Sequence, residues 1–158
     1  PEKACNVCKA EGRVKGEENI KVTIPAGIDN NQAIEIEGKG DAGKKGGKAG
    51  NLYTRIVIKK HALFFRKGDD LYLDHEISYS QAILGDEVEV PTLEKAPILL
   101  KIPAGTESGK VLRVSGKGVP HFGSLGRGNM YVELIIKTPK KLSRKQKQLL
   151  EQLKEEGL

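Results

Sequence analysis

Two cysteines lie three positions apart near the start of the chain, in the run Cys5-Asn6-Val7-Cys8. Two thiols at this spacing supply one edge of the tetrahedron that a structural zinc ion requires. The chain has no other cysteine, and its three histidines lie far away in the sequence. We therefore expect Cys5 and Cys8 to be two ligands of a split metal site whose other half lies outside this chain. A zinc site closed by this chain alone and a redox-active dithiol are the alternatives, although the sequence lacks the βαβ pattern typical of a redox dithiol.

Other residues that could do chemistry show no arrangement typical of an enzyme. Serine, histidine and acidic residues are present, but no spacing indicates a catalytic triad. The runs Gly38–Gly40 and Gly116–Gly118 each read Gly-Lys-Gly and follow predicted strands, but no helix follows them to bind a phosphate. We interpret them as turns in which glycine takes a positive φ. The sequence therefore predicts a protein that is not an enzyme.

The charge balance permits anionic partners without requiring them, because the net charge is only +6. The basic run Lys137–Lys147 has no interleaved aromatic residues on which bases could stack, so nucleic acid is not the expected partner. No apolar stretch approaches the ~20 residues of a membrane span, and no membrane association is expected. The two cysteines at metal-binding spacing favour a reducing, cytoplasmic setting.

The elements that must position these residues are organised as an internal repeat. Four motifs recur 78 residues later without a gap in the alignment. They are Ile24–Gly27 with Ile102–Gly105, Gly38–Gly40 with Gly116–Gly118, Gly50–Tyr53 with Gly128–Tyr131, and Ile58–Lys59 with Ile136–Lys137. One offset held over four motifs indicates a tandem of two related units.

The periodicity of the two units is that of β-strands. Apolar and polar residues alternate in several short segments, and two further segments are more continuously apolar. The alternating segments are 20–24, 33–37, 71–77, 88–90 and 111–114, and the apolar ones are 53–58 and 131–136, which we expect in the middle of a sheet. Gly-rich turns separate them. The predicted fold is all-β, with two tandem small β-sandwich or barrel domains.

Two segments depart from this pattern and predict helices. Residues 78–84 lack alternation and end at Gly85, which is typical of a short helix with a glycine stop. The second helix is expected over 144–156, with Ser143 as its N-cap and Gln146 completing a capping box. Its leucines Leu149, Leu150 and Leu153 recur at helical spacing and form an apolar stripe on a charged helix.

The repeat also predicts domain boundaries. We expect a partial first β-domain over 1–60 with a remnant of a zinc motif at 5–12, a second β-domain over 61–139, and a C-terminal helix over 140–158. The strands that lead into the second copy would have counterparts before residue 16, where the cysteine segment lies instead. Either the chain is a fragment, or an insertion that carries the cysteines interrupts the first unit.

Several motifs, in this order, resemble the DnaJ family of J-domain co-chaperones. They are C-x-x-C-x-x-x-G-R-V, I-P-A-G, G-x-G-x-x-G, G-N-L-Y and H-x-x-F-x-R-x-G-x-D-L, followed by the second I-P-A-G. The resemblance covers essentially the whole chain. It implies the C-terminal substrate-binding region of a zinc-containing member, in which a zinc-binding region is inserted into the first of two β-domains. Ala10 departs from the family's C-x-x-C-x-G-x-G motif.

The resemblance also implies roles for individual residues. Ile34 and Ile36 correspond to a strand beside the family's substrate groove, and Phe64 corresponds to a linker aromatic near it. The leucine stripe of the C-terminal helix corresponds to the dimerisation segment, so a homodimer is implied. Zinc is expected in the full-length parent through Cys5 and Cys8, and none in this chain alone. A DnaK-type chaperone is the implied partner of that parent.

Three hypotheses about function follow. The first is a co-chaperone fragment that binds unfolded or partly folded polypeptides, suppresses their aggregation and delivers them to a DnaK-type chaperone. The second is a structural or dimerisation fragment without client binding of its own. The third and least favoured is a basic nucleic-acid-binding β-protein, whose affinity would fall steeply with salt.

Overall fold

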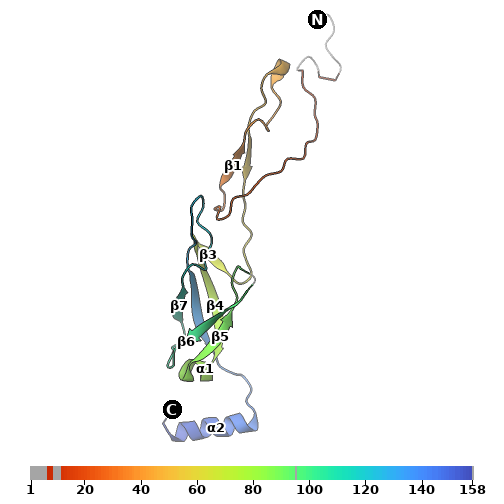
Figure 1. The fold of residues 1–158 in the computed structure, drawn as a ribbon. Helices are drawn as coiled ribbons and strands as arrows, with labels where there is room; N and C mark the ends of the chain where they lie inside the picture. The colour runs from red at the N-terminus through yellow and green to blue at the C-terminus, as the bar shows by residue number, and fades with distance from the viewer. Residues whose placement is uncertain (1–6, 9–11, 95, 158) are drawn as a thin grey trace, which may run out of the picture. The chain divides into compact units, whose positions relative to one another are not determined.

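The computed structural model describes residues 7–8, 12–94 and 96–157 and is built mostly of strands, with one long helix at the C-terminal end (Figure 1). This confirms the predicted all-β fold with a C-terminal helix. The chain divides into two compact units. Unit 1 comprises Pro1–Ala62 together with Val119–Arg127, and unit 2 comprises Leu63–Gly118 with Gly128–Leu158.

Unit 1 contains one antiparallel pair of strands, β1 (Ala33–Ile36) and β2 (Leu52–Arg55). A long loop with a short 3₁₀ turn, η1 (Lys44–Gly46), joins them. Gly40 N–H donates to the carbonyl of Gly50 over 2.8 Å and closes this loop at its base. The expectation that segment 53–58 lies in the middle of a sheet was wrong, because β2 belongs to a two-stranded sheet in the described residues.

The strand predicted at 20–24 was also wrong, because that segment has no strand. Its counterpart in the second copy is β6 (Ile98–Ile102), which pairs with β5 (Asp86–Val90). The positions that correspond to β5, 78 residues earlier, belong to the cysteine segment. Residues 20–24 therefore have no partner strand within the described chain, and alternation alone does not make a strand without one.

Unit 2 contains a four-stranded sheet and the separate β5–β6 pair. In the larger sheet the order is β3 (Phe65–Lys67), β4 (Asp70–Ser78), β8 (Met130–Lys137) and β7 (Lys110–Val114). β8 occupies an inner position, as predicted for segment 131–136. β4 and β8 run parallel, and the other pairs are antiparallel.

The core of unit 2 draws buried side chains from both sheets and from the short helix α1 (Tyr79–Leu84). Alternate residues of β4 and β8 are buried, which places one face of the four-stranded sheet on the core. The most completely buried residues are Ile77, Ala82, Val90, Ile102, Met130, Val132 and Leu134.

The two helices begin with the same sequence signal. Ser78 caps α1 and Ser143 caps α2 (Arg144–Glu155), and in each case the glutamine three residues later closes a capping box. The box at Ser143 confirms the prediction from sequence, whereas the box at Ser78 was not predicted, and α2 ends one residue earlier than expected. Gly85 stops α1 with a φ of 77°, a value that favours glycine.

The repeat is preserved in the geometry. Ala33 lies opposite Arg55 in unit 1, and Val111 lies opposite Glu133 in unit 2, so both hairpins share one register. The hydrogen bond from Gly118 N–H to the carbonyl of Gly128, 2.9 Å long, repeats the Gly40–Gly50 closure. Gly38 and Gly116 have φ of 66° and 69°, which confirms the predicted turns.

Candidate functional site

The first candidate site is one face of the β1–β2 pair. Ile34 and Ile36 project from the same face of β1, opposite Thr54 and Leu52, and all four side chains are half-buried. Unit 1 contributes further apolar side chains that are exposed to solvent, namely Ile24, Val57 and Ile58. The isoleucines thus lie on a small apolar face that is neither a closed core nor fully open to water.

A comparison with unit 2 shows which backbone edge is open beside this face. In unit 2 the strand that corresponds to β2 is β8, and it pairs with β7 on one side and with β4 on the other. β2 pairs only with β1 in the described part of the chain. An unpaired edge of this kind presents backbone N–H and C=O groups to an additional strand.

The opposite face of the same hairpin carries a polar cluster. Glu35 Oε1 accepts hydrogen bonds from the hydroxyl of Tyr53 at 2.8 Å and from Nδ2 of Asn51 at 2.5 Å. The Tyr53 bond, and then the Asn51 bond, lowers the pKa of the Glu35 carboxyl below its ordinary value. The same carboxylate raises the pKa of Tyr53. These bonds fix the outer side chains of β1 and β2 relative to each other.

Phe64 lies in unit 2 and is buried, with 8% of its surface exposed. Its neighbour Phe65 begins β3 and is 68% exposed. The resemblance assigns Phe64 to a linker, whereas the structure buries its side chain and places its neighbour Phe65 on an exposed strand. The role of Phe64 beside a substrate groove stays a prediction.

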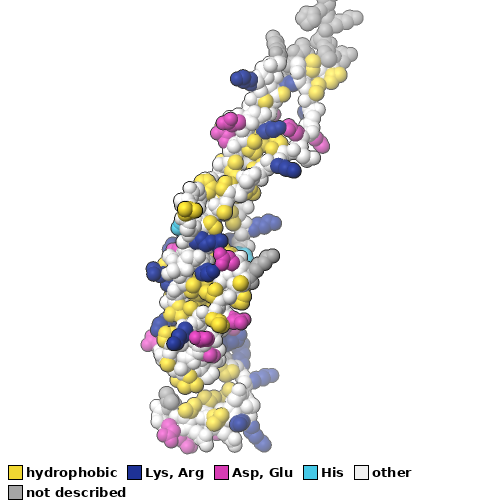
Figure 2. All heavy atoms as spheres, in the orientation of Figure 1, with side chains coloured by type: hydrophobic (Ala, Val, Ile, Leu, Met, Phe, Trp, Pro, Cys, Tyr) yellow, Lys and Arg dark blue, Asp and Glu magenta, His cyan; other side chains and the backbone are white. Residues whose placement is uncertain are grey.

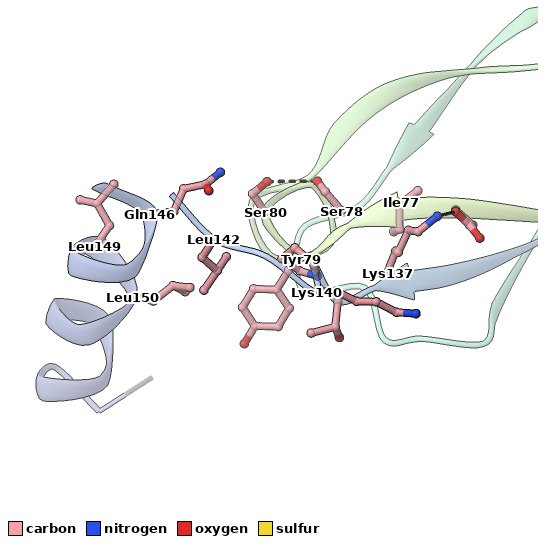
Figure 3. A pocket seen from close by; sticks show the side chains of 13 residues that line it. Ile77, Ser78, Tyr79, Ser80, Lys137, Lys140, Leu142, Gln146, Leu149 and Leu150 are labelled. Carbon is pink, nitrogen blue, oxygen red and sulfur yellow. Dashed lines mark hydrogen bonds and ion pairs between the residues drawn. The ribbon is translucent and has the colours of Figure 1, made fainter. Parts of the chain in front are cut away.

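The second candidate site is the leucine stripe of α2. Leu149, Leu150 and Leu153 are all exposed, and no residue of α2 is buried. Leu149 and Leu150 line an open hollow of about 880 Å³ together with Leu142 and with Tyr79 of α1 (Figure 3). Leu142 and Leu150 point toward Tyr79 in this view. Sequence reasoning missed Tyr79, because nothing in its local pattern indicates that it faces α2.

The basic run beside this hollow is partly neutralised. Lys137 forms an ion pair with Glu76, and Lys147 pairs with Glu151 at 3.7 Å. The first turn of α2 contains no acidic residue, so positive charge there opposes the helix dipole. Figure 2 shows basic and acidic side chains interspersed over the visible surface. This mixture does not single out a phosphate-binding stripe.

The predicted metal ligands are only partly visible. Cys5 lies outside the described residues, and Cys8 is a half-buried free thiol. Within residues 7–8, 12–94 and 96–157, no three His, Cys, Asp or Glu side chains gather in a way that could hold a metal ion. The described residues therefore do not complete a tetrahedral zinc site. Nor does any helix among them have the length and apolar character to span a membrane.

Comparison with known proteins identifies the family. A family model described as the DnaJ C terminal domain matches residues 2–139. Among curated relatives, a protein of Leptospira biflexa is 44% identical over 97% of this chain and 41% of its own length. Relatives from Fusobacterium nucleatum subsp. polymorphum and Methanothermobacter thermautotrophicus are 48% and 46% identical, over 98% and 94% of this chain and 39% of their own lengths.

All three relatives are named chaperone protein DnaJ. The chain spans about two fifths of their length. The match of the family model extends through both repeats and ends just before α2. The chain therefore belongs to the DnaJ C-terminal domain family.

Proposed function

We propose that unit 1 binds unfolded or partly folded polypeptides and so suppresses their aggregation. The observation that carries this proposal is the β1–β2 pair, which combines an open strand edge with the half-exposed face of Ile34 and Ile36. An extended client can add to such an edge through backbone hydrogen bonds while alternate side chains contact the isoleucines. The affinity should be modest, because a disordered client loses conformational entropy when it binds.

The relatives' name supports a co-chaperone role for a protein of their length. Delivery of the bound client to a DnaK-type chaperone and a cytoplasmic location belong to this proposal. Phe64 can contribute to client binding only after a local rearrangement, because its side chain is buried.

We further propose that α2 mediates homodimerisation through Leu149, Leu150 and Leu153. An amphipathic helix of this length is marginal in water unless its apolar side packs on another surface. In this chain all three leucines are exposed. A dimer would present two copies of unit 1 to one client, and binding at both would raise the overall affinity through effective concentration.

Zinc enters the proposal only for a longer protein. There, Cys5 and Cys8 would supply two thiolate ligands, and further cysteines would supply the rest. Metal analysis of the purified chain and of the longer protein, each with Cys5→Ser and Cys8→Ser variants, tests this. Stoichiometric zinc in this chain alone would contradict it.

Client binding is tested by light scattering from a chemically unfolded client protein, with and without this chain. We expect the chain to suppress scattering and Ile36→Asp to abolish the suppression. Ala33→Asp is the matched control, since it adds the same charge to the exposed opposite face of the same strand. Circular dichroism of both variants checks that the fold is intact.

If the intact chain leaves scattering unchanged, client binding fails and the structural or dimerisation hypothesis takes its place. The exposed leucines of α2 are the observation that favours this second candidate. Binding that weakens steeply with salt would instead favour a nucleic-acid partner, because apolar contacts persist or strengthen in salt.

A further inference from the structure

The two copies of the Ile-Pro-Ala-Gly turn differ in how their glycines are covered. Gly27 of the first copy is half-buried, and a Cβ atom added to it would overlap the carbonyl oxygen of Pro120 and lie 3.0 Å from the backbone nitrogen of Phe122. Gly105 of the second copy is exposed, and a Cβ atom there meets nothing within 4 Å. Both glycines have a positive φ, 82° and 70°, so the turns share a backbone conformation but not a covering.

The covering of the first turn is a hairpin loop. The loop is Val119–Arg127, which lies between β7 and β8 in the sequence and belongs to unit 1. Its first residue, Val119, and the residue after Gly27, Ile28, are the only two apolar side chains that are buried among the described residues of unit 1. The fold of this chain therefore already contains one stable arrangement in which a hairpin loop covers such a turn.

The 78-residue offset identifies the loop that corresponds to this one in the first copy. It is segment 41–49, which lies between β1 and β2 and has the same length. Its base is closed by hydrogen bonds between Gly40 and Gly50 and between Gly50 and Asp41, which are 2.8 and 3.0 Å long. Its described residues are exposed, except for the half-buried Gly43. Because a Cβ atom on Gly105 meets no atom of this loop, the loop does not cover the second turn of its own chain.

A hollow lies beside the uncovered second turn. It has a volume of about 500 Å³ and is lined by the end of α1, the start of β5 and the turn residues Pro103 and Ala104. Leu84, which is 77% exposed, adds an apolar side chain to its lining. The turn is fixed against α1, since the N–H of Gly105 donates to the carbonyl of Ile83 over 3.0 Å. We call this hollow, together with Gly105, the Gly105 site.

The Gly105 site and the loop at 41–49 have opposite net charges. Asp86 and Glu87 line the hollow, and the one basic side chain there is Lys101. The carboxylate of Glu87 has no ion pair or side-chain hydrogen bond within the described chain. The loop has three basic residues and one acidic residue, namely Lys44, Lys45, Lys48 and Asp41. Complementary charge of this kind attracts two surfaces and selects between partners.

We propose that the Gly105 site binds the loop at 41–49 of a second copy of this chain. The contact joins unit 2 of one copy to unit 1 of the next, so each copy keeps a further loop and a further Gly105 site for other copies. Such a heterologous contact builds head-to-tail chains unless the rotation closes a ring. It is therefore distinct from the homodimer proposed for α2. One loop covers less surface than the ~1,200–2,000 Å² of a stable interface, so the association is weak and needs high protein concentration.

Sedimentation velocity of the whole chain over a range of concentrations tests this inference. We expect the sedimentation coefficient to keep rising beyond that of a dimer as the concentration increases. Gly105→Ala should prevent this rise, because the added Cβ occupies the place where the backbone of the loop approaches. Gly116→Ala is the matched control, since Gly116 has a φ of 69° and a Cβ atom there also meets nothing within 4 Å. It adds the same backbone strain in a different turn and should leave the rise unchanged.

Charge reversal provides a second test that does not depend on backbone strain. Glu87→Lys and Lys48→Glu should each raise the concentration at which the larger species appear by at least about tenfold, because like charges then face each other. A chain that carries both substitutions should assemble like the unmodified chain, since the two charges are exchanged. Glu89→Lys is the control, because Glu89 is exposed on the same strand but does not line the hollow. Circular dichroism checks that every variant is folded.

The outcomes separate this contact from the one proposed for α2. The rise with concentration should persist in Leu150→Asp, although it then starts from a monomer. A sedimentation coefficient that does not rise beyond that of a dimer would overturn the inference. Larger species that form equally well in Gly105→Ala and in Glu87→Lys would also overturn it, as would their equal loss in Gly116→Ala or Glu89→Lys. If the double charge reversal assembles no better than either single one, the loop at 41–49 is not the segment that binds.

Discussion

A Cβ atom added to Gly27 would lie 2.2 Å from the carbonyl oxygen of Pro120. Gly27 belongs to the Ile-Pro-Ala-Gly motif of the first repeat, whereas Pro120 lies in the hairpin loop of the second. The segment Val119–Arg127 that contains Pro120 nevertheless forms part of unit 1. The contact is possible only because residue 27 has no side chain and takes a φ of 82°.

We predict that Gly27→Ala destabilises the chain more than Gly105→Ala, the same substitution in the second copy. Gly105 also has a positive φ, 70°, but a Cβ there meets no atom within 4 Å. Gly105→Ala should therefore cost only the backbone strain of ~1–2 kcal/mol. Gly27→Ala should cost at least about 2 kcal/mol more, because the loop backbone must move. Equal losses in urea denaturation of the two variants would show that the loop does not pack on Gly27.

Helix α2 should depend on its N-cap. Ser143 accepts a hydrogen bond from the N–H of Gln146, and no residue of the helix is buried to hold it by other means. Ser143→Ala should cost about 1 kcal/mol of helix stability and lower the helical signal in far-UV circular dichroism. Ser143→Asp should restore the signal, because aspartate also caps and adds a negative charge at the helix N-terminus. An unchanged spectrum for Ser143→Ala would contradict the prediction.

The pKa of Glu35 should rise when Tyr53 loses its hydroxyl. The hydrogen bond from Tyr53 is the largest cause of the lowered pKa, so Tyr53→Phe should move the pKa of Glu35 toward its ordinary value. Asn51→Ala should have a smaller effect in the same direction. Carboxyl NMR titration of Glu35 measures both shifts. Tyr131→Phe is the repeat-related control, since Arg113 rather than a carboxylate lies opposite Tyr131.

The same bonds give stability a pH dependence of defined sign. The pKa of Glu35 is lower in the folded chain than in the unfolded chain, so its contribution is present above the unfolded pKa and is lost as pH falls through the folded pKa. Tyr53→Phe should therefore make the chain less sensitive to mild acid. A steeper loss of stability in acid for this variant would show that the Tyr53–Glu35 bond does not have this role.

The oligomeric state should depend on the leucine stripe of α2. Leu150→Asp places a charge among exposed leucines and should shift the chain from dimer to monomer in sedimentation velocity experiments. Gln148→Asp adds the same charge to the same helix away from the stripe and should leave the dimer intact. If both variants sediment like the unmodified chain, α2 is not the dimer interface.

Local signals in the sequence predicted much of the fold. The capping box of α2 was predicted because Ser143 acts on a group only three residues away, whereas the same local signal at Ser78 was overlooked. Strands β1, β4, β5, β7 and β8 were predicted from alternation or apolar runs, which report a face packed on other residues. The strand predicted at 20–24 failed for a non-local reason, because a strand also needs a neighbour in space.

The candidate sites were harder to predict, because they depend on pairing between distant strands. β3 was not predicted, since its three residues, Phe65–Lys67, carry too little periodicity. The stacking of Tyr72 on Tyr131 depends on the parallel register of β4 and β8, which local patterns do not specify. Ile34 and Ile36 were singled out because of the family resemblance, and the α2 leucines because of their helical spacing. Their roles in binding stay predictions.

The parallel pairing of β4 with β8 also constrains how the chain is made. Asp70 begins β4 and accepts a 2.6 Å hydrogen bond from the N–H of Asn129, the residue just before β8, although the two residues are 59 positions apart. At synthesis rates of about 5–20 residues per second, β4 leaves the ribosome several seconds before its partner exists. During that interval Leu71, Leu73 and Ile77 lack the neighbours that bury them. While it is being synthesised, unit 2 is therefore itself vulnerable to aggregation. The pairing of β4 with β8 is a slow step of its folding, because the two strands are far apart in the sequence.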